Sequence, residues 1–571
     1  MKRTLYTPSL TIQFARIAAV IAALAAPVAF ATAIAPLPPG PNPVGCNNIA
    51  QDFSRVPAGQ SAQDFWEGTP DGGTSRYLTD LLADPANTLV VNLPIPDDSA
   101  LYGDYAAQSR RYVVLVCYPT TAANPHADYP LPTGAVLPHM QRGAEAPVFA
   151  DATAKYPLLL FSHGLVGSPI SDDYISALRI FASWGYVVVA PFHGDRRYAN
   201  VKLEDFEDQF YALLNIKDFV AMQAVRPLSL SRALDAVLAH PHFAAHVDPS
   251  RVGGFGASLG GESLLLMGGA QLTTNVGQSS KQVTLDPRLT AAVGYVPYFG
   301  IEVFPAFGRD NNGLRGVKLP FLAISGTADT TAPIGATEQG FERLDSTRQL
   351  VALNGVEHGF ATAFTQDIFT WSLVFLAGQL SGDLPTRATS ATMTSVAGGG
   401  DDVLRIDYMA PTAARTGERI VIEFHNDALD HYFVTAESDE AAMLDAGVVV
   451  PGWSRTKFNF KVRPAGDARG LAACRFFGTP GIGPNSHFYT IDPAECAKVR
   501  GDRMWTFESL AFNADVPVTG ACGADRIPVA RLYNNGMGGQ AGHRYVTSRS
   551  EVRVLTGRGW LLEGNVFCAI P

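Results

Sequence analysis

The stretch RVGGFGASLGGESLLLM, residues 251–267, decides the fold class of the central part of the chain. Its first residues are typical of a short buried strand, and the leucine run near its end is typical of a buried helix. Between the two lies GASLG, in which Ser258 has a glycine two places away on either side, Gly256 and Gly260. Glycine at these places lets neighbouring backbone approach closely. We therefore expect Ser258 in a sharp, strained turn between a strand and a helix.

Alternating strand and helix patterns surround this stretch from residue 110 to residue 382. Near-continuous apolar runs predict buried strands, and apolar positions at helical spacing predict helices between them. Besides the strand before Ser258, the predicted strands are YVVLVCYP, YPLLLFSHG, YVVVAPFH, TAAVGYVPY, LPFLAISG and QLVALNGV, with helices over 172–183, 230–238 and 368–380. This alternation predicts an α/β fold, a mostly parallel sheet with helices on both faces.

Two polar residues follow later strands in the order that a serine nucleophile requires. Asp329 follows LPFLAISG in the segment TADTTAP, and His358 follows QLVALNGV in VEHGF. Because an open parallel sheet brings the carboxyl ends of its strands to one edge, we expect both side chains beside Ser258. There His358 would be the base, and Asp329 the acid that orients it.

Each of these residues also has a simpler interpretation. Taken singly, Asp329 suits a turn cap and His358 a polar residue at a helix start. Glu357 is a competing acid beside the histidine, although adjacent residues in an extended segment point to opposite sides. The ordered set of three is a stronger signal than any of its members.

A serine that attacks a carbonyl group also needs donors for the negative charge that develops on the carbonyl oxygen. We assign them to the backbone N–H groups of Leu259, directly after the serine, and of Leu165, in the loop after YPLLLFSHG. His163 and His193, in loops after two strands, are interpreted as packed residues because His358 fills the base position. The aromatic candidates for an apolar substrate pocket are Trp184, Tyr295, Tyr298 and Phe299.

The segment 203–222 has two interpretations. As one helix it would carry an apolar face, formed by Phe206, Phe210, Leu213 and Val220. It follows a strand at a point where hydrolases insert caps, which suggests a lid over an acyl pocket. An ordinary amphipathic helix packed on the sheet explains the pattern as well.

The first 33 residues have the parts of an export signal: a basic start, an apolar run over 17–30 and the small residues ATA at 31–33. Pro27 breaks the run, which is shorter than the roughly 20 residues of a spanning helix, so we expect no stable membrane anchor. The prediction is a secreted protein, periplasmic or extracellular, that starts near Ile34. Residues 34–109 are expected to hold a proline-rich leader and the start of the catalytic domain.

Composition and charge predict a large folded protein without a nucleic-acid partner. The chain has 571 residues, 47% of them hydrophobic and 17% charged, with a formal net charge of −10. It is long enough to bury more than one core. No block of Lys or Arg stands out, so we expect no nucleic-acid partner.

The six cysteines fall into two regions with an even number in each, which favours disulfides in an exported protein. We expect the pairs Cys46–Cys117, Cys474–Cys496 and Cys522–Cys568, although the last four cysteines permit three connectivities. Zinc is disfavoured because no CxxC spacing occurs, and we expect neither a metal nor a cofactor.

Residues 383–418 are rich in Thr, Ser, Ala and Gly, which predicts a linker with one strand, VLRIDYM, inside it. Residues 419–571 then carry an internal repeat of three units of about 50 residues. Each unit has a strand, a histidine in a second aromatic strand, a short helical pattern with a glutamate, and a tryptophan. The histidines are His431, His487 and His543, and the tryptophans are Trp453, Trp505 and Trp560.

Repetition of one unit predicts a smaller α+β or β-rich module with pseudo-threefold symmetry. The three histidines offer a metal site and the tryptophans a sugar-stacking platform. We interpret both sets instead as core residues, since buried aromatic strands commonly satisfy one polar group by hydrogen bonds.

The motifs YPLLLFSHGLVGSP, FASWGYVVVAPFH, GFGASLGG, SGTADTTAP and VEHGF resemble secreted α/β-hydrolases over residues 110–380. The groups concerned are dienelactone hydrolases, platelet-activating-factor acetylhydrolases and bacterial polyester hydrolases. The roles implied are nucleophile, acid and base for Ser258, Asp329 and His358, and oxyanion donors for Leu165 and Leu259. The chain departs from dienelactone hydrolases, whose nucleophile is a cysteine, and FSHGL favours a carboxylic ester. DHYFVTA, NSHFYTI and RLYNNG resemble an uncharacterised repeat domain of secreted bacterial proteins, which implies no ligand.

These observations predict a secreted serine hydrolase that cleaves small or polymeric carboxylic esters through an acyl-enzyme on Ser258. The repeat module is expected to bind a surface or polymer. One alternative is a serine peptidase or amidase with the same residues. The other is a catalytically inactive surface-binding protein that acts through its repeats, which an unstrained turn at Ser258 or a distant His358 would favour.

Overall fold

The computed structural model describes residues 32–47, 89–131, 134–141, 145–201, 203, 205–301, 304–360, 365–398, 402–410, 412–448, 450–537 and 541–571. The predicted export signal lies almost entirely outside these residues, as do residues 48–88. None of the helices in the described ranges is long and apolar enough to span a membrane.

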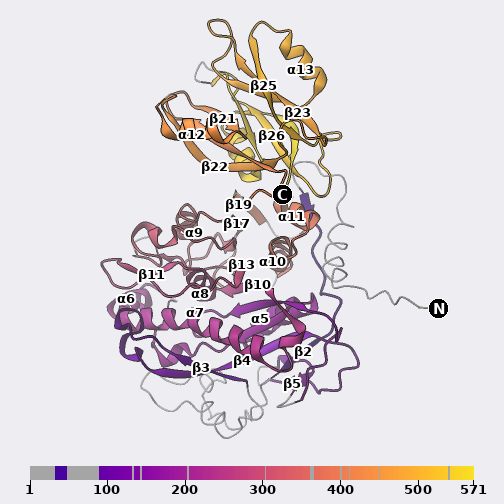
Figure 1. Ribbon diagram of the computed structural model, residues 1–571. Helices are drawn as coiled ribbons and strands as arrows, with labels where there is room; N and C mark the ends of the chain where they lie inside the picture. The colour runs from indigo at the N-terminus through magenta and orange to yellow at the C-terminus, as the bar shows by residue number, and fades with distance from the viewer. Residues whose placement is uncertain are drawn as a thin grey trace, which may run out of the picture.

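The N-terminal part is built on one mixed sheet (Figure 1). Its strands are β2 (Val44–Asn47), β3 (Val90–Pro94), β4 (Ser109–Pro119), β7 (Met140–Gln141), β8 (Tyr156–Ser162), β9 (Val187–Pro191), β10 (Val247–Ala257), β13 (Leu289–Tyr295), β16 (Phe321–Gly326), β17 (Arg348–Leu353) and β19 (Asp402–Tyr408). They lie in the order β19-β17-β16-β13-β10-β8-β9-β4-β2-β7, and β3 pairs with β4. The strands from β9 to β17 are parallel, whereas β4 and β19 are antiparallel to their neighbours β9 and β17. The predicted mostly parallel sheet is confirmed.

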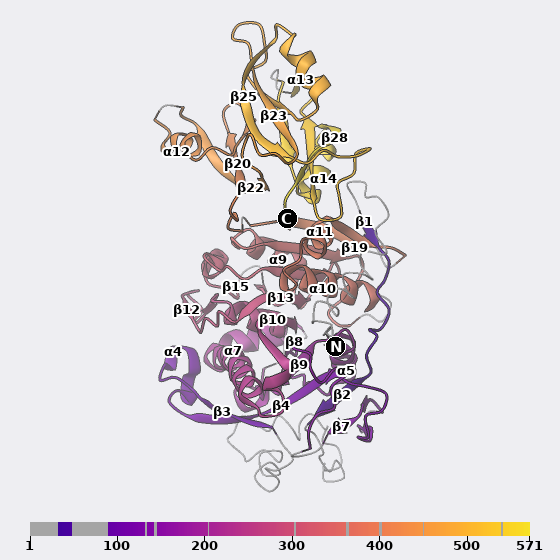
Figure 2. The same ribbon diagram turned by 45° about the vertical axis from the view of Figure 1, so that its right-hand side comes forward.

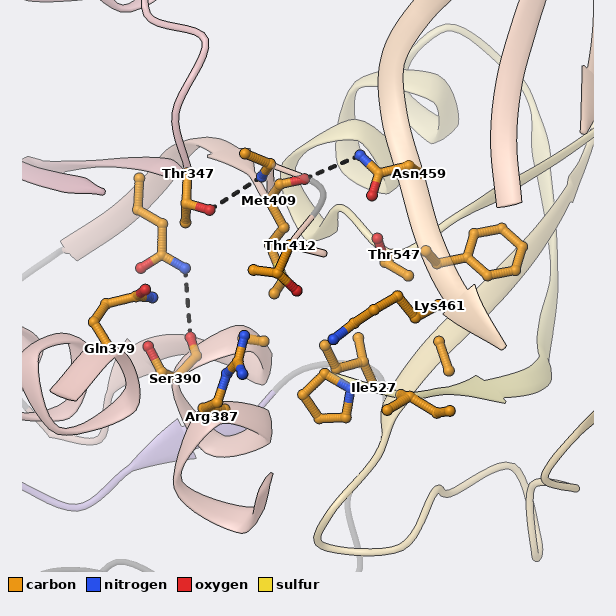
Figure 3. Close-up of a pocket in the computed structure, with 17 residues that line it drawn as sticks. Thr347, Gln379, Arg387, Ser390, Met409, Thr412, Asn459, Lys461, Ile527 and Thr547 are labelled. Carbon is orange, nitrogen blue, oxygen red and sulfur yellow. Dashed lines mark hydrogen bonds between the residues drawn. The ribbon is translucent and has the colours of Figure 1, made fainter. Parts of the chain in front are cut away.

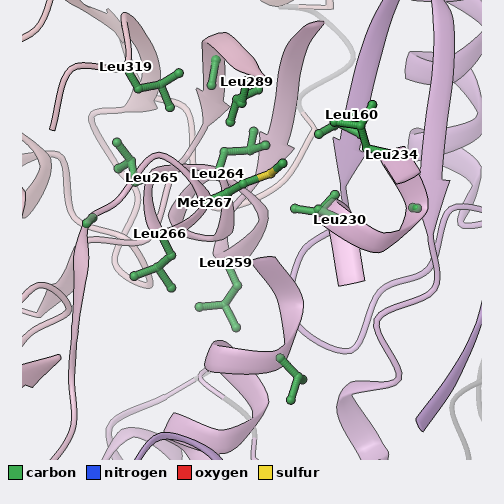
Figure 4. Packing of buried hydrophobic residues seen from close by; sticks show 14 of the residues in the cluster. Leu160, Leu230, Leu234, Leu259, Leu264, Leu265, Leu266, Met267, Leu289 and Leu319 are labelled. Carbon is green, nitrogen blue, oxygen red and sulfur yellow. The ribbon is translucent and has the colours of Figure 1, made fainter. Parts of the chain in front are cut away.

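Helices cover both faces of this sheet. They are α4 (Ser99–Tyr102), α5 (Asp172–Ser183), α6 (Phe206–Leu214), α7 (Ile216–Ala239), α8 (Leu259–Met267), α9 (Ile334–Phe341) and α10 (Thr365–Leu380). Side chains alternate along β8: Leu158 and Leu160 belong to the apolar cluster of α7 and α8, and Leu159 and Phe161 to that of α5 and α10. Figure 4 shows the first cluster, in which leucines of α7 and α8 gather beside Leu160. The strand before Ser258 is thus held between two cores.

Short elements complete this part. They are the strands β1 (Thr32–Ile34), β5 (Tyr129–Pro130), β6 (Val136–Leu137), β11 (Gln271–Thr273), β12 (Ser280–Gln282), β14 (Gly300–Ile301), β15 (Phe304–Pro305) and β18 (Met393–Val396), and the 3₁₀ helices η3 (Gly103–Tyr105), η4 (Asp195–Arg197), η5 (Ala244–His246) and η6 (Arg309–Leu314).

The segment expected to be a linker is mostly folded onto the main sheet. It forms α11 (Leu384–Thr392), then β18, which pairs with β1, and then β19, an edge strand of the sheet. Its small residues serve packing: a Cβ on Gly378 of α10 would lie 2.5 Å from the Cβ of Ser390 in α11. A composition typical of linkers here reflects close helix packing, and the predicted strand VLRIDYM falls on β19.

Within the described part of residues 419–571, three small antiparallel sheets follow one another in the chain. They are β20 (Arg419–Asn426), β21 (His431–Thr435) and β22 (Trp453–Val462); β23 (Leu471–Gly478), β24 (His487–Thr490) and β25 (Trp505–Ala514); and β26 (Ile527–Tyr533), β27 (His543–Val546) and β28 (Leu561–Ala569). A helix follows the second strand of each: α12 (Ser438–Ala446), α13 (Pro493–Arg500) or α14 (Arg549–Gly557). Phe424, Phe512 and Phe567, one from each sheet, share an apolar core. The C-terminal part is therefore β-rich.

The disulfides join the cysteines as expected from the sequence, Cys46–Cys117, Cys474–Cys496 and Cys522–Cys568. The first links the neighbouring strands β2 and β4. It ties the leader covalently to the main sheet.

The C-terminal sheets contact the main sheet at its β19 edge, which lies beside them in both views (Figures 1 and 2). Arg549 at the start of α14 donates to both carboxylate oxygens of Asp407 in β19, at 2.8 Å each. Both side chains are almost fully buried. A buried, two-pronged ion pair therefore fixes one part on the other.

Candidate active site

Ser258 stands in a strained turn between β10 and α8. Its φ is 53° and its ψ −119°, a backbone conformation that side-chain-bearing residues rarely adopt. The surrounding backbone holds the turn: Ser258 N–H donates to the carbonyl of Tyr295 at 2.9 Å, and the Ser258 carbonyl accepts from Tyr298 N–H at 3.1 Å. The serine side chain consequently projects at the carboxyl edge of the sheet.

The glycines on either side of Ser258 have no room for a side chain. A Cβ on Gly256 would lie 2.3 Å from the carbonyl carbon of Gly260, and a Cβ on Gly260 would lie 1.9 Å from the carbonyl oxygen of Ser162. Both contacts are with backbone, which cannot move aside without shifting a strand or a helix. The turn therefore requires glycine at both places.

His358 and Asp329 meet Ser258 in a chain of hydrogen bonds. His358 Nε2 lies 3.1 Å from Ser258 Oγ, and His358 Nδ1 lies 2.8 Å from Asp329 Oδ2. The other carboxylate oxygen of Asp329 accepts from the N–H groups of Thr331 at 2.9 Å and Ala332 at 2.8 Å. Since Nδ1 must donate to the carboxylate, Nε2 is left to accept the serine proton. Glu357 is exposed, and its neighbour His358 pairs with Asp329 instead.

The loop after β8 lies beside the serine. A Cβ on Gly164 would be 3.6 Å from the Cβ of Ser258, and the loop continues directly into Leu165. Leu259 is the first residue of α8, so its N–H has no acceptor within the helix. Among the described residues neither Leu165 N–H nor Leu259 N–H has a protein acceptor, whereas Gly164 N–H donates to the Tyr174 hydroxyl at 3.0 Å. Two backbone N–H groups near Ser258 are therefore available to donate a hydrogen bond to a ligand.

A buried ion pair holds this loop in place. Arg226 of α7 donates through Nη2 to the carbonyls of His163 at 2.8 Å and Gly164 at 2.9 Å. Its Nε donates to Asp195 Oδ1 at 2.9 Å, and Asp195 Oδ2 accepts from Val166 N–H at 2.9 Å. The pair therefore binds the backbone on both sides of Leu165.

Sequence reasoning missed Arg226 and Asp195. The available signal was a lone arginine inside the apolar stretch VAMQAVRPLSL, because a charge at a buried helical position requires a partner. The identity of that partner, 31 residues away, was not visible in the sequence.

The two loop histidines are packed residues within a hydrogen-bond network. His163 Nε2 accepts from His193 N–H at 3.1 Å, and burial, with the charge of Arg226, lowers the pKa of His163 to about 3. His193 contacts the hydroxyls of Ser162 at 2.8 Å and Ser229 at 2.9 Å, and burial also lowers its pKa. Both imidazoles are neutral at neutral pH and are engaged away from Ser258.

One further acid lies under the serine, on the first turn of α8. Glu262 is fully buried, and desolvation raises its pKa to about 8. Its Oε1 accepts from Gln223 Nε2 at 2.6 Å. A carboxyl group that is mostly neutral at neutral pH was not anticipated from the sequence.

Of the four aromatic pocket candidates, Tyr295 and Tyr298 lie at the serine. Tyr295 donates its hydroxyl proton to the carbonyl of Gly359, directly after His358. The backbone N–H of Tyr298 donates to the carbonyl of Ser258. Phe299 instead packs in the core, its ring 5.3 Å from that of Phe307. Two of the four candidates therefore lie near Ser258, and two do not.

Trp184 requires a correction. It follows the last residue of α5, which starts at the carboxyl end of β8 and returns to the amino end of the parallel strand β9. Its indole donates to the carbonyl of Pro38 at 3.2 Å. Trp184 therefore lies at the opposite edge of the sheet from Ser258 and cannot line a pocket there.

The segment 203–222 is two helices, α6 and α7, with Asn215 between them. Phe206 and Phe210 of α6 are 79% and 53% exposed, whereas Val220 in α7 is buried. The expected common apolar face does not exist, because the helix is interrupted at Asn215 and the residues on either side belong to different helices. The α7 part packs on the sheet, as the second interpretation expects, whereas α6 contacts α7 and leaves Phe206 and Phe210 exposed.

Two of the three histidines of the C-terminal repeats, His487 and His543, pack against aromatic rings. His487 lies 4.5 Å from the Phe433 ring and His543 lies 5.1 Å from the Phe488 ring, each in the preceding unit. Burial lowers the pKa of His543 to about 4. In the part of the chain that the structure describes, no group of three His, Cys, Asp or Glu side chains is arranged to hold a metal ion.

Two known families match parts of the chain. Residues 138–225 match the family described as platelet-activating factor acetylhydrolase, isoform II, and residues 419–570 match DUF5648, a domain of unknown function. A search of curated proteins found no match. The first match supports an α/β-hydrolase-like family for the N-terminal part. It includes the loop of Leu165 and ends before Ser258.

Proposed function

We propose that the chain is a secreted serine hydrolase that cleaves carboxylic esters through an acyl-enzyme on Ser258. The observation that carries the proposal is His358, with Nε2 3.1 Å from Ser258 Oγ and Nδ1 bonded to the buried Asp329. The matched acetylhydrolase family supports an esterase-type hydrolase. The strained serine turn and this short distance disfavour an inactive surface-binding protein.

In the proposed reaction His358 Nε2 removes the Ser258 hydroxyl proton as Oγ attacks the ester carbonyl carbon. The N–H groups of Leu165 and Leu259 bind the resulting oxyanion. When this tetrahedral intermediate collapses, the bond between the carbonyl carbon and the alkoxy oxygen breaks. The alkoxy oxygen takes the proton from the His358 imidazolium and leaves as the alcohol. His358 then deprotonates a water molecule as it attacks the acyl carbonyl carbon, which forms a second tetrahedral intermediate. When this intermediate collapses, the bond to Ser258 Oγ breaks, Oγ takes the proton from the His358 imidazolium, and the carboxylic acid leaves.

Replacement of the nucleophile tests this mechanism. Ser258→Ala should lower kcat on a short-chain aryl ester about a thousandfold or more and abolish labelling by a fluorophosphonate. Ser250→Ala, at an exposed serine within β10, should behave as wild type. Equal activity of wild type and Ser258→Ala would refute the proposal. The matching anilide, measured in parallel, distinguishes an esterase from an amidase.

We also propose that the three C-terminal units close into a pseudo-threefold ring. Ion pairs that join successive units support this arrangement. They are Glu440–Arg475 at 2.8 Å from the first unit to the second, Glu495–Arg531 at 3.0 Å from the second to the third, and Arg544–Glu423 at 2.9 Å from the third back to the first. A closed ring needs no terminal cap for its core.

The ring is proposed to hold the enzyme on a surface or an insoluble polymer. A chain that ends at residue 410 keeps β19, and should hydrolyse a soluble ester at the wild-type rate but lose activity on a polyester film. Equal activity of both proteins on the film would remove the targeting role.

Export is proposed from the N-terminal signal pattern and is supported by the three disulfides, since such bonds persist mainly in oxidising compartments. N-terminal sequencing of the protein recovered outside the cytoplasm should begin near Ile34. Recovery of a protein that begins at Met1 would refute cleavage.

A further inference from the structure

A cavity of about 50 Å³ lies between the main sheet and the C-terminal sheets (Figure 3). One wall is formed by β17, α10, α11 and the residues after β19, and the other by β22 with the ends of β26, β27 and β28. A cavity of this size holds a few water molecules or one small ion. It lies outside the proposed active site, and none of its lining residues belongs to that site.

Two cationic side chains enter this cavity from opposite walls. Lys461 of β22 and Arg387 of α11 both extend into the space between them (Figure 3). Lys461 is 7% exposed. Burial lowers the pKa of both groups. The charge of Arg387 lowers the pKa of Lys461 further, and the charge of Arg415 lowers that of Arg387.

Neither cation has a counterion in contact. Among the described residues, the side chains of Lys461 and Arg387 form no ion pair and donate no hydrogen bond to a protein group. Glu418 attracts both charges from a distance but pairs with neither. No Asp or Glu side chain lines the cavity. Two like charges, one buried and one half-buried, thus face the same small space, which is unfavourable unless an anion joins them.

The rest of the lining is rich in neutral donors. Asn459 donates to the carbonyl of Met409 at 3.2 Å and Thr347 accepts from Ala410 N–H at 3.0 Å, so these two stabilise the walls. Within the described ranges, the hydroxyls of Thr412 and Thr547 and the amide of Gln379 are engaged in no hydrogen bond. The cavity therefore combines two cations with several uncommitted polar groups.

We propose that this cavity binds a small oxyanion, a phosphate or a carboxylate, between Lys461 and Arg387. A guanidinium fits two oxygens of such an ion side by side, and an ammonium adds a compact charge from the other wall. Because one cation belongs to the main-sheet part and the other to the C-terminal part, the bound ion joins the two parts. The inference does not depend on the proposed esterase activity.

Thermal unfolding of the full-length protein tests the site. Inorganic phosphate and acetate are each titrated against chloride at one pH and one ionic strength. The expected result is a saturable rise in Tm with phosphate, acetate or both, beyond that with chloride. The arm that responds identifies the class of oxyanion. Equal Tm values in all three salts would overturn the proposal.

Variants separate specific binding from the general stabilising effect of phosphate, which acts on any folded protein. Lys461→Met and Arg387→Met should each weaken the apparent Kd at least about tenfold. Lys498→Met, which removes an exposed lysine of α13, should leave the Kd unchanged. A Tm rise of the same size in all four proteins would overturn the proposal.

A second measurement remains decisive if a methionine variant fails to fold. The ³¹P resonance of inorganic phosphate should broaden with wild-type protein, and acetate, if it shares the site, should reverse the broadening. Phosphate that broadens equally with wild type and with Arg387→Lys or Lys461→Gln would contradict binding between these two side chains.

Discussion

Buried cations have opposite surroundings in two regions of this molecule. At the carboxyl edge of the main sheet Arg226 is fully buried against Asp195 and two loop carbonyls. In the cavity between the two parts, the buried Lys461 and the half-buried Arg387 face each other, and no Asp or Glu side chain is among the described lining residues. The paired cation fixes a backbone loop in one position, whereas the unpaired ones leave room for a ligand. Pairing, rather than burial itself, distinguishes the structural charge from the proposed binding site.

The largest effect is expected where the paired cation is removed. Arg226→Met leaves Asp195 buried without its partner, and should lower the free energy of unfolding by about 3 to 5 kcal/mol. In the folded fraction, kcat should fall while KM changes little, because the loop that carries Leu165 N–H loses its anchor. Urea unfolding and steady-state kinetics measure the two effects.

Arg226→Lys is the matched control, since it keeps the charge but cannot bond to Asp195 and both carbonyls together. It should recover part of the stability and less of the kcat. Wild-type stability and kcat in Arg226→Met would show that the loop is held by other contacts.

A smaller effect is expected at Glu262, a buried acid that forms no ion pair with any described residue. Burial raises its pKa from 4.5 to about 8 in the folded state, so the neutral form stabilises the protein at low pH. The free energy of unfolding attributable to this group falls as the pH rises from about 4.5 through about 8. Between about pH 6 and about pH 9 the loss should be about 2 to 3 kcal/mol.

Glu262→Gln does not titrate and keeps an acceptor for Gln223. Its stability should therefore lack this decline, which chemical unfolding of both proteins across the pH range measures. Parallel profiles would mean that Glu262 is ionised throughout.

The smallest effect is expected where an unpaired cation is removed. In chloride without oxyanion, Lys461→Met should leave the free energy of unfolding unchanged or raise it by up to about 1 kcal/mol, because a desolvated charge is replaced by an apolar chain. The same urea titration should show that Arg226→Met lowers the free energy of unfolding, whereas Lys461→Met leaves it unchanged or raises it. A loss of several kcal/mol in Lys461→Met would instead imply a partner for the ammonium in the free protein.

The order of residues along the chain was enough to predict much of the candidate site. Ser258, Asp329 and His358 each follow a predicted strand, and a parallel sheet necessarily brings such positions to one edge. The even number of cysteines in each region indicated disulfides, but it left three connectivities open for the last four cysteines. These inferences needed only chain order and the direction of strands.

Other features depend on contacts that chain order does not reveal. Trp184 was misplaced because it follows a helix, which returns the chain to the far edge of the sheet. The segment 383–418 was taken for a linker because small residues at a helix contact have the same composition as a flexible segment. Arg226 was missed because its partners come from other strands and loops. Each case requires knowledge of what packs against the residue.

The position of β19 determines where this chain can be divided. By composition the catalytic part would end near residue 382, but β19 is the antiparallel edge strand beside β17. A protein cut at that point would lose its last strand and expose the amides and carbonyls of β17, a row able to pair with a second molecule. Such a fragment would be prone to self-association however complete its active site, so the working boundary lies after residue 408.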